Sequence, residues 1–213
     1  MQTIFIHGLG QNASSWNRTL PLLAEPVHAA CPDLAAMLKS SEADYASLYH
    51  AFSDYCGNFP EPLNLCGLSL GGILALQYAI EHPDRVQSLT LIGAQYKMPK
   101  KLLRLQSLIF GVMPKSAFEN TGFQKETFIQ LTNSMTELDF SERLRELSCA
   151  VLILCGEKDS ANIKAAKTLA ECIPGARLTV LAGTGHEANI ENPEALASEL
   201  NTFLLPLSKE NRV

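Results

Sequence analysis

Six short apolar runs recur along this chain, each interrupted by few polar residues. They cover residues 3–6, 27–31, 63–66, 86–92, 150–155 and 177–181. Runs of this length without alternation are typical of strands buried on both faces, as in parallel sheets. The segments between them mostly show helical spacing. The pattern therefore predicts an α/β fold, with a mostly parallel sheet of about six strands and helices on both of its faces.

Apolar residues at helical spacing predict the helices between these strands. In residues 70–81, for example, Leu70, Ile73 and Leu74 share one face. That helix ends before Pro83, because the residue preceding a proline disfavours the α region. The last helix begins at Pro193, behind a capping asparagine. Helices are predicted over residues 12–24, from 40 or 41 to about 55, and over 70–81, 125–135, 139–147, 163–172 and 193–205.

Residues 95–137 differ in character from the rest of the chain. Apolar positions are interleaved there with basic ones, and Gly111 and Pro114 are expected to break the segment into short helices. Because the segment emerges after a sheet strand, we expect a lid with an apolar face toward the core and a basic outer face. A plain solvated helical pair is the alternative. The predicted domains are a core of residues 1–94 and 138–208, the lid, and a tail of residues 209–213.

The segment after the third apolar run contains a Gly-x-Ser-x-Gly motif, with Gly67 and Gly71 on either side of Ser69. The chain must turn there from a strand into a helix within about two residues, which forces the serine into a strained backbone conformation. Glycines two residues before and after it avoid collisions between strand and helix. The motif predicts a nucleophile elbow that presents the Ser69 hydroxyl above the sheet.

Further polar groups follow other predicted strands, and all of them should lie at the same edge of a parallel sheet. A serine nucleophile needs a base, and the base needs an acid that orients it. The sequence predicts Ser69 as nucleophile, His186 as base and Asp159 as acid, with Glu157 as the alternative acid. The backbone N–H groups of Leu9 and Leu70 would hold an oxyanion. His7 abuts a glycine turn and is interpreted as structural.

Composition narrows the function classes. The net charge of −5 argues against a nucleic-acid-binding protein, for which a basic face is expected. No apolar run approaches the length of a membrane span, and residues 1–7 lack the basic region of a signal peptide. The six cysteines form no Cys-x-x-Cys pair, which favours buried thiols in a reducing cytoplasm. No pattern of metal ligands is present.

Taken together, the motifs resemble the α/β-hydrolase superfamily across nearly the whole chain. The matching pieces are His7-Gly8-Leu9-Gly10, Pro32-Asp33-Leu34, Gly67-Leu68-Ser69-Leu70-Gly71-Gly72, His82-Pro83-Asp84-Arg85-Val86, Gly156-Glu157-Lys158-Asp159 and Gly183-Thr184-Gly185-His186. The resemblance implies a lid after the sixth family strand, a Ser-Asp-His triad, Leu9 and Leu70 as oxyanion donors, and no cofactor. The chain departs from the family in starting on what would be its third strand, in having Ala35-Ala36 after the Pro-Asp-Leu segment, and in its small lid, which suggests an open site.

These observations lead to the hypothesis of a cytoplasmic serine hydrolase that cleaves a carboxylic ester of a small or medium apolar acyl group through an acyl-enzyme. A thioesterase, a lactonase or a carbon–carbon hydrolase with the same triad is the enzymatic alternative. A ligand-binding homologue with slow turnover is the non-enzymatic one. The side chains expected to contact the substrate are Trp16, Leu103, Ile109 and Met113.

Within the superfamily, the motifs are similar to those of esterases that demethylate pimeloyl-carrier-protein methyl ester. That similarity suggests that basic lid residues could meet an acidic carrier protein or a CoA phosphate. The residues concerned are Lys97, Lys100, Lys101 and Arg104. A solvated basic face is the plainer interpretation, and the expected partner remains a small-molecule ester.

Overall fold

The structure is a computed structural model that describes residues 2–24, 27–38 and 43–210. Six strands form one sheet in the order β2-β1-β3-β4-β5-β6, and every neighbouring pair is parallel. The strands are β1 (Gln2–Ile6), β2 (His28–Ala30), β3 (Leu63–Leu68), β4 (Val86–Ile92), β5 (Ala150–Gly156) and β6 (Arg177–Leu181). All six apolar runs became strands, which confirms the predicted fold class.

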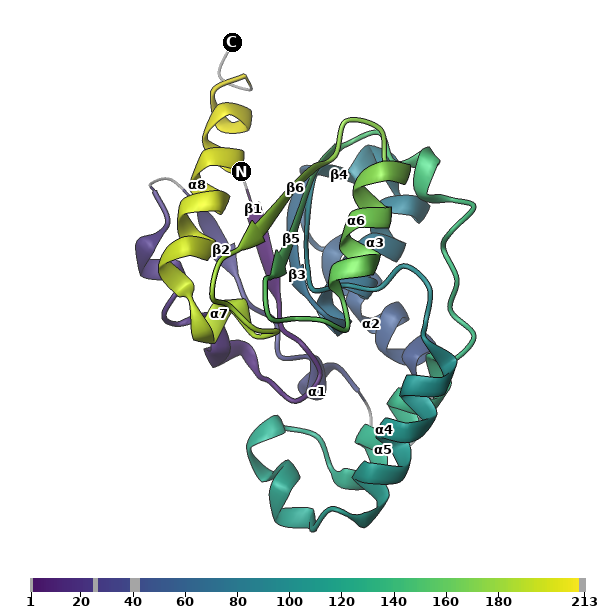
Figure 1. Cartoon of the computed structure of the whole chain (residues 1–213). Coiled ribbons are helices and arrows are strands. Elements are labelled where there is room, and N and C mark those ends of the chain that lie inside the picture. Colours follow the sequence, from purple (N-terminus) through teal and green to yellow (C-terminus); the bar gives the residue numbers. More distant parts are fainter. Residues whose placement is uncertain (1, 25–26, 39–42, 211–213) are drawn as a thin grey trace.

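Helices cover both faces of this sheet, as Figure 1 shows. On one side lie α2 (Tyr45–Gly57), α3 (Leu70–Glu81) and α6 (Ile163–Cys172), and on the other lies α8 (Pro193–Glu210). Successive strand residues point to opposite faces, so Ile4 and Ile6 belong to the core under α2, α3 and α6, whereas Phe5 packs in the core under α8. The unalternating apolar strands are therefore explained by two cores, one on each face.

Two predicted helices are wrong. Residues 12–24 form only two short 3-10 turns, Ala13–Trp16 and Leu20–Leu22. Pro21 lies within this segment and has no N–H to donate, which disfavours a continuous α-helix. In residues 139–147, only Leu144–Glu146 is helical. There the backbone of Phe140 donates instead to the carbonyl of Tyr96, and Lys97 and Asp139 form an antiparallel bridge.

Other predicted boundaries shift by a few residues. Helix α2 is capped by the Asp44 side chain, which accepts from the Ser47 N–H. The predicted caps, Ser40 and Ser41, lie outside the described residues. Helix α8 continues to Glu210, beyond the predicted end at residue 205 and into the predicted tail, of which residues 211–213 are not described. The short helices α1 (Leu34–Met37) and α7 (Ala188–Glu191) complete the core.

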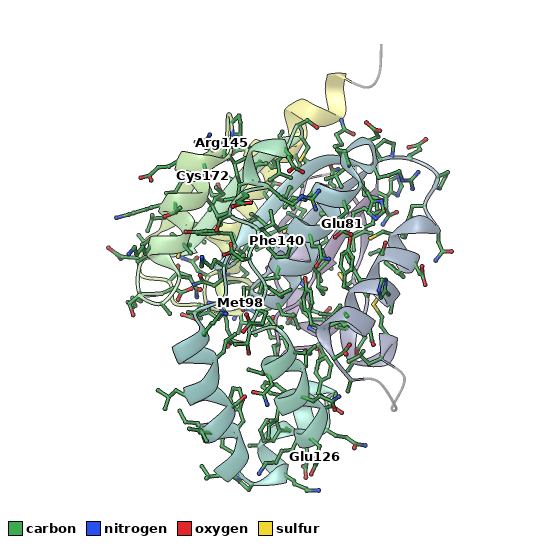
Figure 2. All side chains as sticks on the ribbon, turned by 90° about the vertical axis from the view of Figure 1, so that its right-hand side faces the viewer. Glu81, Met98, Glu126, Phe140, Arg145 and Cys172 are labelled. Atoms are coloured by element: carbon green, nitrogen blue, oxygen red, sulfur yellow. The ribbon has the colours of Figure 1, made fainter. Side chains whose placement is uncertain are left out.

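The segment between β4 and β5 is helical and projects from the carboxyl edge of the sheet as an arm (Figures 1 and 2). It consists of α4 (Lys100–Val112), a 3-10 helix (Lys115–Thr121) and α5 (Lys125–Ser134). Figure 2 places Met98 at the junction with the core and Glu126 near the far end. Gly111 lies inside α4, so the predicted break there is wrong; Pro114 and Gly122, which has a φ of 73°, mark the breaks.

None of the helices within the described residues has both the length and the apolar character that crossing a membrane requires. The six cysteines are unpaired, and Cys56, Cys66 and Cys155 are buried. Burial raises the pKa of the Cys56 thiol to about 12, so this thiol stays protonated at neutral pH.

Candidate active site

Ser69 occupies the turn between the end of β3 and the start of α3. Its φ of 56° and ψ of −111° make it the one non-glycine residue with positive φ in the described part of the chain. Such a conformation costs on the order of 1–3 kcal/mol. Neighbouring groups hold it in place, because the Ser69 N–H donates to the Ile92 carbonyl (2.8 Å) and the Ser69 carbonyl accepts from the Ile73 N–H (3.0 Å). The predicted strained elbow is present.

The glycines on either side of Ser69 are required by close backbone approaches. A Cβ on Gly67 would lie closer than 3.0 Å to the Gly71 carbonyl oxygen. A Cβ on Gly71 would come equally close to the carbonyl oxygen of Ile6 on β1. Contacts this short are with backbone atoms, which cannot rotate away as a side chain can. The spacing of the motif thus follows from how tightly α3 passes β3 and β1.

His186 and Asp159 form a hydrogen-bonded pair beyond the ends of β6 and β5. His186 Nδ1 lies 2.7 Å from Asp159 Oδ2, and Asp159 is almost completely buried. Because a carboxylate can only accept, Nδ1 carries the proton and Nε2 is left with a free lone pair. This hydrogen bond raises the pKa of His186 above its ordinary value, against the opposing effect of burial. The arrangement suits a general base.

Asn162 supports Asp159 from the start of α6. Its Nδ2 lies 2.9 Å from each carboxylate oxygen of Asp159, and its Oδ1 accepts from Gln95 Nε2 at 2.7 Å. Burial alone would raise the pKa of Asp159, but the hydrogen bonds from His186 and Asn162 outweigh it and hold that pKa below its ordinary value. The carboxylate is therefore charged at neutral pH.

Neither Asn162 nor Gln95 was predicted to belong to the site. Asn162 occupies the N-cap position of α6, and a sequence pattern would assign its side chain to capping, but it makes no capping hydrogen bond and turns to Asp159 instead. Gln95 comes shortly after the end of β4, and its position after a strand was the available signal. That signal could not show which side chain Gln95 would contact.

The loop that carries His186 is fixed by the Glu191 carboxylate. Glu191 accepts from the N–H groups of Gly185 (2.7 Å) and Glu187 (3.0 Å), the two neighbours of His186. Gln11 connects this loop to the glycine turn after β1, since its Nε2 donates to Glu187 Oε1 at 2.9 Å. His186 and the glycine turn are thus held in one hydrogen-bonded unit.

One cavity of about 370 Å³ brings the predicted groups together. Its wall includes Ser69, Asp159 and His186, together with Leu9 and Leu70. The apolar part of the wall comes mainly from the arm and the segments at its base, through Met98, Leu103, Phe110, Phe128 and Met135. The cavity therefore combines a serine, a histidine and an apolar surface at the carboxyl edge of the sheet.

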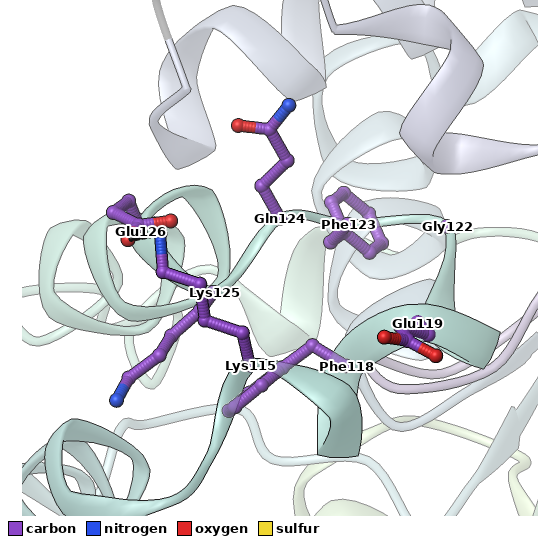
Figure 3. Close-up of a pocket in the computed structure, with 8 residues that line it drawn as sticks. All are labelled: Lys115, Phe118, Glu119, Gly122, Phe123, Gln124, Lys125 and Glu126. Carbon is purple, nitrogen blue, oxygen red and sulfur yellow. Dashed lines mark ion pairs between the residues drawn. The ribbon is translucent and has the colours of Figure 1, made fainter.

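A second hollow, of about 490 Å³, lies at the tip of the arm (Figure 3). The described residues that line it include no Ser, Cys or His. Its Lys115 and Glu126 side chains neutralise each other in an ion pair of 2.8 Å. Among the described residues there is also no group of three or more His, Cys, Asp or Glu side chains placed to hold a metal ion. The cavity at Ser69 is accordingly the candidate active site.

Most of the side chains predicted to contact the substrate do not line the cavity. Trp16 is completely buried beside Phe5, with ring centroids 5.3 Å apart, so it cannot touch a substrate and that prediction is wrong. Ile109 is 47% exposed, and neither it nor Met113 lines the cavity. Leu103 is the predicted contact that does line it. Spacing along α4 could not reveal which side of the helix would face inward.

The structure also separates the remaining candidates. His7 is buried, with Nδ1 2.9 Å from the Gly8 carbonyl oxygen and Nε2 accepting from the Leu34 N–H, which agrees with a structural role. Glu157 accepts from the Gly183 N–H, so Asp159 and not Glu157 is bonded to His186. Of the basic lid residues, Lys97 pairs with Asp139 and Lys100 with Glu137, while the side chains of Lys101 and Arg104 lie outside those described.

Comparison with known proteins gives one consistent result. The sequence model described as the alpha/beta hydrolase family matches residues 3–199. Among curated relatives, monoacylglycerol lipase abhd6-B of Xenopus laevis is 23% identical over 96% of this chain and 75% of that protein. The pimeloyl-[acyl-carrier protein] methyl ester esterase of Aeromonas hydrophila is 25% identical over 94% of both chains. A carboxylesterase structure from Nitrososphaera gargenis shares the fold with a TM-score of 0.85, at 21% identity over 98% of this chain and 91% of that one.

Proposed function

Because this chain belongs to the alpha/beta hydrolase family and is an α/β-fold hydrolase, we propose that it cleaves carboxylic esters by serine catalysis through an acyl-enzyme. The observation that carries the proposal is the shared cavity, in which a strained serine and a histidine bonded to a buried aspartate meet an apolar wall. The relatives named for lipid and methyl esters support an ester as the substrate.

In the proposed reaction, Ser69 Oγ attacks the ester carbonyl carbon while His186 Nε2 takes its proton. The Leu9 and Leu70 N–H groups stabilise the oxyanion, and the N-terminal end of α3 adds a favourable dipole. His186 then protonates the leaving alcohol. A water molecule, deprotonated by His186, then attacks the acyl-enzyme carbonyl carbon. His186 returns this proton to Ser69 Oγ as the bond between Oγ and the acyl group breaks and the carboxylic acid leaves. Asp159 stays charged throughout and stabilises the imidazolium form of His186.

The acyl group is proposed to be apolar and of small or medium size. The wall contributed by Leu103, Phe110 and Phe128 offers no charged side chain to an acyl chain. A carrier protein or CoA as the acyl donor gains no support from Lys97 and Lys100, since both are paired with carboxylates of this chain. A thioester, a lactone or a carbon–carbon bond would engage the same three residues.

The test is hydrolysis of p-nitrophenyl esters from acetate to decanoate by the wild type, Ser69→Ala and His186→Ala. We expect both variants to lose activity by several orders of magnitude, since triad members act as a unit. The chain-length optimum reports the size of the acyl site. Ser198→Ala, which alters an exposed serine on α8, is the matched control and should retain full activity.

A fluorophosphonate probe separates catalysis from mere binding. It should label the wild type and Ser198→Ala but not Ser69→Ala. A folded wild type that neither hydrolyses an ester nor reacts with the probe would refute the proposal and favour a ligand-binding protein. If the protein hydrolyses only thioesters or lactones, the proposed triad stands and the proposed substrate class is wrong.

A further inference from the structure

Helix α4 exposes a continuous apolar face on the outside of the arm. Leu105, Leu108, Ile109 and Val112 are 54%, 70%, 47% and 85% exposed. Their spacing of three, four and seven residues places them on one side of the helix. Eight large apolar side chains are exposed among the described residues, and these four share a single surface. Isolated exposed apolar residues are ordinary, but a contiguous apolar surface indicates an interaction site.

This face is separate from the one that forms the cavity. Leu103 and Phe110, on the inner side of α4, line the cavity, and Ser107 donates to Asn133 of α5 at 2.5 Å. The inner side of the helix therefore has its partners in the arm and the core. We call the outer side, formed by Leu105, Leu108, Ile109 and Val112, the outer face of α4.

The charge of the arm differs in sign from that of the whole chain. Residues 95–137 contain six Lys or Arg and three Glu, in a protein whose net charge is −5. At the first turn of α4, the charge of Lys100 is paired with that of Glu137. At the other end, Lys125 Nζ lies 2.7 Å from the Gly111 carbonyl oxygen and 2.6 Å from that of Met113, on either side of Val112 in the sequence. The arm thus has a net positive charge, and the Lys125 ammonium lies at the C-terminal end of the outer face of α4.

We propose that the outer face of α4 binds an anionic lipid surface. A helix with aliphatic side chains on one face and basic groups beside them is suited to lie in the interface, where its side chains enter the acyl region and its cations meet lipid headgroups. Such binding needs no complementary protein surface. It goes beyond the proposed ester hydrolysis and does not depend on Ser69.

A second copy of the chain fits this face less well. A 13-residue helix is about 20 Å long, so one face of it covers roughly 200 Å², against about 800 Å² per partner in a standard interface. A symmetric contact through this face would also bring two positively charged arms together. Both size and charge favour a lipid surface over self-association.

The test is flotation of the full-length Ser69→Ala protein with vesicles of phosphatidylcholine and phosphatidylglycerol in equal amounts. The Ser69→Ala background prevents turnover, so binding is measured whether or not the protein is an esterase. We expect the double substitution Leu108→Ser/Val112→Ser to lower partitioning at least tenfold. The control, Leu22→Ser/Val180→Ser, removes two apolar side chains that are each 43% exposed on the core and should leave partitioning unchanged.

Vesicles of phosphatidylcholine alone should bind less protein, and added salt should weaken binding to the anionic vesicles. The proposal would be overturned if both double variants lost vesicle partitioning equally, or if the parent protein did not float with the vesicles. A concentration-dependent dimer in sedimentation velocity that Leu108→Ser/Val112→Ser abolishes, without vesicle binding, would assign the face to self-association instead. Hydrolysis of a soluble short-chain ester should be unaffected by Leu108→Ser/Val112→Ser, since neither residue lines the cavity.

Discussion

The carboxyl edge of the sheet and the helical arm beside it are stabilised by different kinds of interaction. At the edge, buried polar groups are fixed by directional hydrogen bonds, such as those that Asp159 accepts from His186 and Asn162. In the arm, a cluster of phenylalanine rings packs with centroids 4.9–6.4 Å apart, and its lysine–glutamate pairs lie in solvent.

The two kinds of interaction differ in how strictly they fix the orientation of the side chains involved. Hydrogen bonds to charged groups define orientation and are costly to lose, whereas aromatic packing tolerates rearrangement and exposed ion pairs contribute about 0–1 kcal/mol. The edge therefore holds Asp159 and His186 in one geometry. The arm supplies much of the apolar wall, and we expect substitutions on its outer side to leave that geometry unchanged. The same kind of substitution should have unlike effects in the two regions.

The largest effect is expected from Gly71→Ala at the edge. The new Cβ would collide with the Ile6 carbonyl oxygen on β1, a backbone atom in the middle of the molecule. We expect the free energy of unfolding to fall by about 2–4 kcal/mol, measured by urea denaturation. Ester hydrolysis should fall as well, because Ser69 is only two residues away.

Gly111→Ala in the arm is the matched control for this substitution. Apart from its chain neighbours and the backbone of its own helix, no atom of the described residues lies within 4 Å of the position where its Cβ would be placed, and the residue is inside α4. Alanine should raise the free energy of unfolding by about 0.5–1 kcal/mol and leave activity unchanged. Similar destabilisation by the two substitutions would remove the contrast between edge and arm.

Asn162→Ala should have an intermediate effect, confined to turnover. Asp159 would lose the hydrogen bonds from Asn162 Nδ2 and keep the one from His186. Hydrogen bonds to a charged group contribute about 1.5–3 kcal/mol, which corresponds to a roughly 10- to 100-fold loss of kcat. KM should change little, because Asn162 is not proposed to contact the ester carbonyl of the substrate. Asn58→Ala, at an exposed position after α2, provides the control. An unaltered kcat would show that Asp159 holds His186 without help.

The smallest effect is expected on the pH dependence. His186 must be neutral to act as a base, and the hydrogen bond to Asp159 raises its pKa above the ordinary value, so kcat/KM should fall as the pH drops through that raised pKa. Glu191 also raises this pKa through its negative charge. Glu191→Gln should therefore move the acid limb to lower pH by a fraction of a unit, whereas Glu194→Gln on α8 should not move it. A shift to higher pH would contradict the electrostatic explanation.

Local sequence patterns predicted the edge more fully than the arm. Ser69, Asp159 and His186 each follow a strand, and the parallel sheet brings such positions together whatever the intervening segments do. The support from Asn162 and Gln95 was not predictable, because it depends on how the ends of β4 and β5 face each other. Trp16 was misassigned for a similar reason, because its burial beside Phe5 is a tertiary contact that local spacing does not show.

In the arm, periodicity predicted helices but not their orientation. Helix α4 is apolar on both its inner and outer faces, so spacing alone could not distinguish Leu103, which lines the cavity, from Ile109, which does not. Gly111 was expected to interrupt the helix, but glycine near a helix end costs only about 1 kcal/mol and is tolerated. The domain boundaries at residues 94 and 138, and the movement of a lid, remain predictions.

The order of the strands has a consequence for the folding kinetics of this protein. Ser69 follows β3, Asp159 follows β5 and His186 follows β6, so the cavity joins residues that are distant along the chain. Contacts between distant residues form slowly, because long loops must close before the contact can stabilise them. A chain that has collapsed around β1, β3 and β4 still lacks both Asp159 and His186. Recovery of activity during refolding therefore reports the pairing of β5 and β6. The return of the helical circular dichroism signal does not.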